Sequence, residues 1–121
     1  MMEVYNLIKS IQKRPLMYIH EEKIDYIYYL LVGYCAALSK HNSPIEMDKK
    51  FSFWFEKWLN DWLKFNYDDN CQLKTYCWGQ ILKEITKSEE EAVQLFYKLC
   101  EQFFSDYEEG KGYFEWKNNQ N

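Results

Sequence analysis

Few side chains in this chain of 121 residues are of the types that enzymes use for proton transfer or nucleophilic attack. The chain has two histidines, His20 and His41, and both fall in segments whose composition is typical of loops. A Cys–His nucleophile pair is compatible with this composition, but the sequence has neither a nucleophile elbow nor a His-Glu-x-x-His helix. We therefore expect a protein that is not an enzyme.

The four cysteines, Cys35, Cys71, Cys77 and Cys100, form no Cys-x-x-Cys pair. The spacing of Cys71 and Cys77 fits neither a zinc knuckle nor a redox-active disulfide. All four fall in or beside segments predicted to be helical, so we interpret them as buried free thiols. Free thiols are typical of a reducing compartment, and the N-terminal residues have an amphipathic pattern rather than that of a leader peptide. We therefore expect a cytoplasmic protein.

Asp68, Asp69 and Asn70 are similar to a fragment of a calcium-binding loop, but the glycine and the closing glutamate of that motif are missing. This segment is predicted to be a turn. The four glycines of the chain form no phosphate-binding loop of the G-x-G-x-x-G or Walker type. The sequence therefore predicts neither a metal ion nor a cofactor.

The uncharged stretch Tyr26–Leu38 organises the rest of the chain. A surface helix is apolar along one stripe, whereas this stretch is apolar nearly all round, which predicts a helix over about residues 24–40 that other helices surround. Gly33, Ala36 and Ala37 are small enough to let a second helix approach closely. The stretch is shorter than the roughly 20 apolar residues that cross a bilayer. We interpret it as the centre of a folded core and expect no membrane association.

Apolar residues spaced three and four apart predict four further helices, at about residues 3–13, 51–65, 73–85 and 88–107. A chain of this length forms one domain on size grounds. The predicted fold is therefore all-α, a compact single-domain bundle of about five helices (residues 1–121) around the buried central helix. Residues 108–121 have no helical period and are predicted to form an aromatic and polar C-terminal tail that is partly ordered.

Local signals refine this arrangement at three points. Pro15 ends the first helix, and residues 17–19 after it are expected to pack beneath the central helix. Gly79 costs about 1 kcal/mol relative to Ala inside a helix, which indicates close packing or a local irregularity there. Ser88 and Glu91 have the spacing of a capping box, which predicts the start of the last helix.

The net charge of −4 is unevenly distributed. Residues 1–50 carry seven Lys/Arg against six Asp/Glu, whereas residues 51–121 carry eight against thirteen. An acidic surface repels phosphate backbones, so we expect no direct contact with nucleic acid. The same charge suits a basic protein partner, although it also serves solubility alone.

Several motifs occur together in this chain. Lys-Arg-Pro-Leu-Met-Tyr-Ile follows the first helix at residues 13–19, and a Gly-Tyr pair lies near the middle of the uncharged stretch. An aromatic helix and a Trp-containing helix ending Ile-Leu-x-x-Ile follow, and then Glu-Glu-Ala-x-x-Leu-Phe at residues 90–96. Over residues 3–105 the chain resembles a group of small α-helical bacterial proteins that are found beside polymorphic toxins and are interpreted as cytoplasmic immunity proteins. It departs from that group in having His20 in place of a glycine and in its longer aromatic tail.

The resemblance implies an immunity protein that binds a cognate toxin and blocks its active site or substrate channel. Many such toxins are basic nucleases, which would match the acidic second half of this chain. We expect the contact residues among the acidic and exposed aromatic side chains of that half: Asp61, Tyr67, Asp68, Asp69, Glu89, Glu90, Tyr107, Glu108, Glu109 and Trp116.

Two other functions stay open on the sequence. One is a helical adaptor or regulatory subunit of a larger bacterial complex, and the other is a helical bundle that binds a small molecule in a pocket lined by the Tyr-rich central helix. The chain itself is either a monomer or a homodimer. A toxin-like reading frame directly upstream would favour immunity, whereas an operon of housekeeping genes would favour the adaptor.

Overall fold

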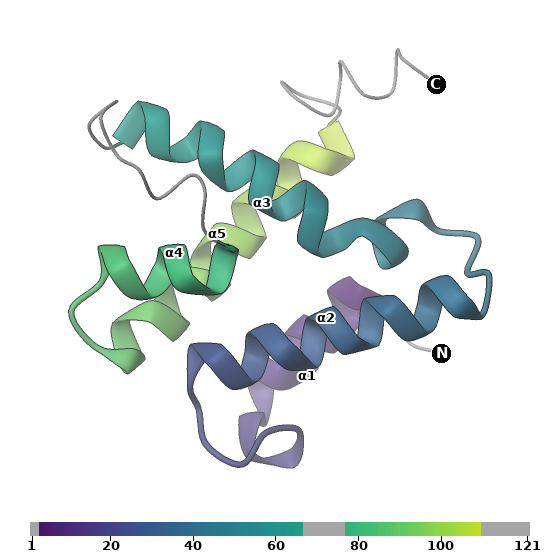
Figure 1. Cartoon of the computed structure of the whole chain (residues 1–121), viewed down its shortest axis with the longest axis horizontal. Coiled ribbons are helices and arrows are strands. Elements are labelled where there is room, and N and C mark those ends of the chain that lie inside the picture. Colours follow the sequence, from purple (N-terminus) through teal and green to yellow (C-terminus); the bar gives the residue numbers. More distant parts are fainter. Residues whose placement is uncertain (1–2, 67–76, 110–121) are drawn as a thin grey trace.

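The computed structural model describes residues 3–66 and 77–109, and its regular secondary structure within these ranges is entirely helical. The elements are α1 (Val4–Lys13), the short 3-10 helix η1 (Pro15–Met17), α2 (Ile24–Lys40), α3 (Glu46–Asn66), α4 (Trp78–Ile85) and α5 (Glu89–Glu109). They pack as one compact bundle, in which α1 lies behind α2 and α5 passes behind α3 and α4 (Figure 1). The predicted all-α fold with five helices is confirmed.

The central helix has the predicted bounds, and it packs against each of the other four described helices. One stripe of it is buried in the core: Ile24, Ile27, Leu31, Cys35 and Leu38. The opposite face is exposed, with Tyr29 at 68% of its full accessibility. A Cβ added at Gly33 would meet no heavy atom within 4 Å among the described residues. The expectation that a second helix packs closely on Gly33 is therefore wrong for the described part of the chain.

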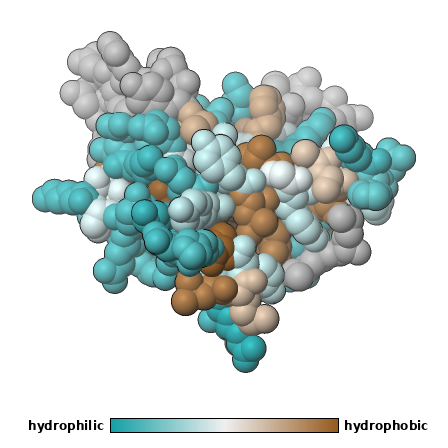
Figure 2. All heavy atoms as spheres, turned by 60° about the horizontal axis from the view of Figure 1, so that its bottom comes forward, coloured by the Kyte–Doolittle hydropathy of each residue, from teal (hydrophilic) through white to brown (hydrophobic). Residues whose placement is uncertain are grey.

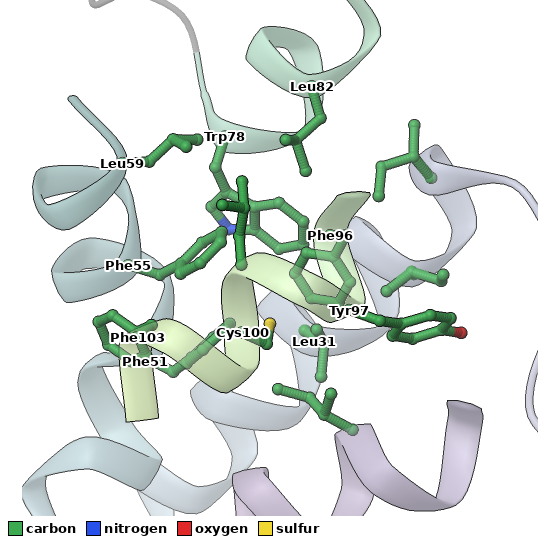
Figure 3. Close-up of a cluster of buried hydrophobic side chains, with 14 of the residues drawn as sticks. Leu31, Phe51, Phe55, Leu59, Trp78, Leu82, Phe96, Tyr97, Cys100 and Phe103 are labelled. Atoms are coloured by element: carbon green, nitrogen blue, oxygen red, sulfur yellow. The ribbon is translucent and has the colours of Figure 1, made fainter. Parts of the chain in front are cut away.

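The large rings gather between α3, α4 and α5 (Figure 3). The cluster contains Phe51, Phe55, Trp78, Phe96 and Phe103. Trp78 is fully buried, and its ring stacks on that of Phe96 with 4.8 Å between centroids. Its indole N–H donates to the Ser52 hydroxyl at 3.3 Å, which satisfies the single polar atom of the side chain. Offset and edge-on ring pairs of this kind stabilise a core by about 0.5–1.5 kcal/mol each beyond the burial of their surface.

Asp48 links α3 to α1. Its side chain is buried, with 3% exposed, and one carboxylate oxygen accepts a hydrogen bond from the Val4 backbone N–H at 2.8 Å. The first N–H groups of a helix have no partner inside that helix, so Asp48 supplies the acceptor that the start of α1 needs. Asp48 also lies in the first turn of α3, where the helix dipole favours a negative charge. One carboxylate therefore serves two helix N-termini.

The local signals at Gly79 and Ser88 are confirmed. A Cβ at Gly79 would lie 3.1 Å from Tyr28 side-chain atoms, so the glycine allows α4 to pack closely against α2. At the start of α5 the Glu91 N–H donates to the Ser88 hydroxyl at 3.1 Å. The Glu91 carboxylate in turn accepts from the Lys87 backbone N–H at 3.0 Å, whereas a capping box predicts the Ser88 backbone N–H as the donor.

The connector before α2 differs from the expectation. Only Ile19 is buried there, whereas Met17 is 68% exposed and Tyr18 is half-exposed. The backbone N–H groups of Tyr18 and Ile19 both donate to the Pro15 carbonyl, so η1 closes as a tight turn. This turn leaves Leu16 and Met17 pointing into solvent instead of beneath α2.

Two other boundaries also differ. α3 begins at Glu46, five residues before its predicted start, and has a non-helical backbone conformation at Lys50, where it kinks. α5 continues to Glu109, two residues beyond its predicted end. The predicted start of α4 and most of the predicted tail, residues 110–121, lie outside the described residues.

Candidate protein-binding surface

Most of the candidate contact residues that the structure describes lie on one helix. Glu89, Glu90, Tyr107, Glu108 and Glu109 belong to α5, and Asp61 belongs to α3. Tyr67, Asp68, Asp69 and Trp116 lie outside the described residues.

The last helix carries an unusual excess of negative charge. It has seven acidic residues, Glu89, Glu90, Glu91, Glu101, Asp106, Glu108 and Glu109. Its one basic residue is Lys98, so its formal charge is −7 + 1 = −6. Because a helix rises about 1.5 Å per residue, α5 forms a ridge roughly 30 Å long, and its acidic residues gather at the two ends, in residues 89–91 and 101–109. Of these acids, Glu101 is paired with the Lys9 ammonium at 2.9 Å. The buried stripe of α5 faces the aromatic cluster, and Glu90, Glu101 and Glu108 face solvent. We call these three residues with Lys98 the α5 outer face.

At the N-terminal end of this ridge the two candidates have different roles. A Glu89 carboxylate oxygen accepts a hydrogen bond from the Ile24 backbone N–H at 3.3 Å, so Glu89 serves as an acceptor at the start of α2. Glu90 is exposed and has no ion-pair partner among the described residues. Glu90 is therefore the candidate here whose charge is free for a partner.

At the other end, α5 is fixed to α3 by two contacts. The Trp58 indole N–H donates to an Asp106 carboxylate oxygen at 2.9 Å. The Tyr107 ring lies 6.1 Å from that of Trp54, and both side chains are partly buried. A partly buried aromatic pair of this kind has the composition of an anchor at a protein interface.

Two exposed acidic side chains lie on the same helices as this aromatic pair. Glu108 is exposed on the last turn of α5, and Asp61 is exposed on α3, one turn beyond Trp58. Asp61 lies 3.8 Å from the Lys64 ammonium in an exposed ion pair, which costs little to open because such surface pairs contribute only about 0–1 kcal/mol.

The candidates thus form two groups at opposite ends of α5. Glu90 and Glu108 are 18 residues apart, which corresponds to about 27 Å along the helix. A standard interface covers roughly 800 Å² on each partner, a patch about 30 Å across. One partner therefore reaches both groups only if it lies along the length of α5.

Two of the cysteines considered for chemistry, Cys35 and Cys100, are buried. Burial raises the pKa of the Cys35 thiol to about 11 and also raises the pKa of Cys100, so both thiols are protonated at neutral pH and are poor nucleophiles. His20 and His41 are exposed, and His41 lies at the edge of an open depression of about 610 Å³ beside Asp48. Within the described ranges, no group of three or more His, Cys, Asp or Glu side chains has a metal-binding arrangement.

Further titratable side chains surround the start of α4. Glu56 on α3 accepts a hydrogen bond from the Trp78 backbone N–H, and its burial raises the pKa of its carboxyl. The Tyr28 hydroxyl lies beside Cys77, and burial raises the pKa of Tyr28 to about 12. This cluster was not predicted from the sequence, because its members come from three different helices. We interpret it as structural, because Glu56 supplies the acceptor that the first turn of α4 needs.

None of the described helices combines the length and the apolar character that crossing a membrane requires. The chain matches no protein-family model, no curated protein and no solved structure. The shape and charge of its surface are therefore the basis for a functional proposal, together with the motif resemblance described above.

Proposed function

We propose that this protein is a cytoplasmic immunity protein that binds a cognate bacterial toxin and neutralises it without catalysis. The single observation that carries the proposal is the charge of α5, −6 over 21 residues on a helix whose outer face is open to solvent. The motif resemblance supplies the class of partner, and the charge supplies the chemistry by which that partner would be recognised.

The mechanism is electrostatic attraction followed by steric blockage. A negative ridge raises the rate at which a basic protein arrives, typically by 10-fold to 1000-fold at low salt. A toxin that acts on nucleic acid has a basic substrate channel, and a partner lying along α5 would place carboxylates where phosphates otherwise bind. Tyr107, fixed against Trp54, would supply an apolar anchor that slows dissociation.

The first test is rescue. The chain would be co-expressed with the product of the toxin-like reading frame next to its gene, and growth arrest would be scored with and without it. Rescue together with a 1:1 complex supports the proposal. Growth arrest that persists although both proteins are present and folded refutes it.

The second test separates charge from mere contact. We expect the double substitution Glu90→Lys and Glu108→Lys to lower the association rate at low salt by about tenfold or more, because steering scales with the local field. The matched control is the double substitution Glu3→Lys and Glu84→Lys, which changes the net charge by the same amount at two exposed acids outside the α5 outer face. Surface plasmon resonance at several salt concentrations measures both. Equal effects of the two changes would show that net charge alone matters and that α5 is not the docking element.

A further inference from the structure

The exposed side of α2 is apolar and has no partner among the described residues. It consists of Tyr26, Tyr29, Val32, Gly33, Ala36 and Lys40, which we call the α2 outward face. Figure 2 brings forward the side of the molecule on which α1, α2 and the connector lie, and it shows hydrophobic residues gathered in a band between hydrophilic flanks. Contiguous exposed apolar surface on a folded protein commonly marks a contact with another molecule.

We propose that the α2 outward face is the contact between two copies of this chain, which pair their α2 helices antiparallel about a two-fold axis midway between Tyr29 and Gly33. The occupant of the face is therefore a second copy of the same protein. Shape, charge and area of the face support this pairing, whatever the identity of any toxin.

The face is complementary in shape to itself in one direction only. Its N-terminal half carries the bulky rings of Tyr26 and Tyr29, and its C-terminal half, from Gly33 to Ala36, carries almost no side chain. In the antiparallel arrangement the two rings of each copy lie over the small residues of the other. A parallel pair would set ring against ring and leave the small residues facing one another. Because nothing lies within 4 Å of a Cβ at Gly33, the second helix can approach there to a short distance.

The charges at the two ends also favour the antiparallel arrangement. At the N-terminal end the Glu21 and Asp25 carboxylates are in ion pairs within the chain, at 3.1 and 3.0 Å, while Glu22 has none among the described residues. At the C-terminal end Lys40 likewise has no ion pair in the described ranges. Antiparallel pairing brings Glu22 of each copy toward Lys40 of the other, and it also opposes the two helix dipoles. Parallel pairing would bring like charges together.

The available area indicates a reversible dimer. Tyr26 is 39% exposed and Tyr29 is 68% exposed, so with about 150–250 Å² per ring the pair offers roughly 160–270 Å² in each copy. Two copies would bury about 320–540 Å² from these rings, against the roughly 1,200–2,000 Å² of a standard interface. The remaining residues of the α2 outward face, among them Val32 at 37% exposure, add to this sum. The dimer should therefore dissociate on dilution.

The experiment is sedimentation velocity of the full chain, without any toxin, from low micromolar to submillimolar concentration. We expect reversible dimerisation by the wild type. Gly33→Leu should raise the dimer dissociation constant at least tenfold, because the new side chain holds the helices apart. The same change should leave the thermal unfolding midpoint unchanged or higher, since the position is open in the monomer and Leu is a better helix former than Gly.

A charge exchange tests the direction of pairing. Glu22→Lys and Lys40→Glu should each weaken the dimer, and the double variant should restore it, because the antiparallel pair then regains opposite charges. A chain that stays monomeric at every concentration overturns the proposal and leaves the α2 outward face to a different protein. A dimer that ignores both Gly33→Leu and the charge exchange overturns it as well, because the contact then lies on another face.

Discussion

Asp48 is the residue whose substitution tests the packing argument most directly. Its carboxylate is buried and accepts the first free N–H of α1 from a residue 44 positions away in the chain. Replacement by Ala removes the acceptor and leaves the Val4 N–H buried without a partner. Replacement by Asn keeps an acceptor oxygen of the same reach and removes only the charge. The two variants therefore separate the hydrogen bond from the electrostatic contribution.

The expected magnitude follows from the burial. A hydrogen bond to a charged group contributes about 1.5–3 kcal/mol, and a buried N–H without an acceptor costs about 1–3 kcal/mol. Both values describe the loss of the same interaction, so they are not added. We expect Asp48→Ala to lower the unfolding free energy by about 2 kcal/mol. For a domain of this size that corresponds to a fall in the unfolding midpoint of roughly 6–10 °C. Asp48→Asn should cost only about 0.3–1 kcal/mol, the usual contribution of one charge at a helix N-terminus.

Urea unfolding followed by tryptophan fluorescence measures both variants, and amide exchange at Val4 reports the hydrogen bond itself. The slope of the unfolding free energy against urea should stay constant, because the same surface is exposed on unfolding. A loss below about 0.5 kcal/mol for Asp48→Ala would refute the reasoning, since that is the low end for an N-cap change. Equal losses for Ala and Asn would show that charge, and not the acceptor, stabilises α1.

Three further predictions concern the core. Gly79→Ala should lower the unfolding free energy by about 1 kcal/mol. Overpacking against Tyr28 at 3.1 Å costs about 1–3 kcal/mol, which exceeds the gain in helix propensity of about 1 kcal/mol. Urea unfolding measures the difference, and a variant more stable than the wild type would contradict the prediction. Burial raises the pKa of the Glu56 carboxyl, so the folded state holds this proton more tightly than the unfolded state. The ionised carboxylate therefore lowers the free energy of unfolding. This loss of stability is present above the folded-state pKa and disappears as the pH falls through it. Glu56→Gln, which can still accept from Trp78, should therefore exceed the wild type in stability at neutral pH and lose that advantage in acid, as melting temperature against pH would show; two parallel profiles would count against this. Burial also raises the pKa of the Cys100 thiol, so a maleimide should modify it only as fast as the protein unfolds, and rapid labelling of the native protein, mapped by mass spectrometry, would disprove this.

The helices were predictable because their signals are local. A three-four apolar spacing depends only on the helical period, and the capping box at Ser88 depends only on four consecutive residues. The packing at Gly79 was predictable for the same reason, since a glycine inside a strong helical pattern needs a reason to be there. The structure contains these features because its tertiary contacts favour the same local conformations.

Burial of α2 was predicted less well because its composition is compatible with both a buried and an exposed face. Tyrosine has a large apolar ring and a hydroxyl that solvent can hydrogen-bond. The residue type therefore does not predict whether Tyr26 and Tyr29 are buried or exposed. Uncharged residues all round the helix therefore indicated a surrounded helix, although one face is open. The same ambiguity affects Met17, where an apolar side chain in a tight turn follows the backbone outward.

The candidate surface was predicted only as a set of residue types. Acidic residues in the second half of the chain could be counted, but their collection on α5 with a net charge of −6 depends on where that helix begins and ends. The roles of Glu89 and Asp48 as acceptors for distant helices had no local signal, because each partner lies more than forty residues away. Sequence patterns identify faces of helices, and only the packing of the helices decides which polar groups stay free.

The position of α1 has a consequence for synthesis on the ribosome. Among the described helices α1 emerges first, yet the Val4 N–H is hydrogen-bonded to a residue 44 positions later, and the Lys9 ammonium pairs at 2.9 Å with a Glu101 carboxylate 92 positions later. Until α5 has left the exit tunnel, the buried stripe of α1 has no complete surface to pack on. We expect the nascent chain to keep that stripe accessible to chaperones until α5 packs against α1.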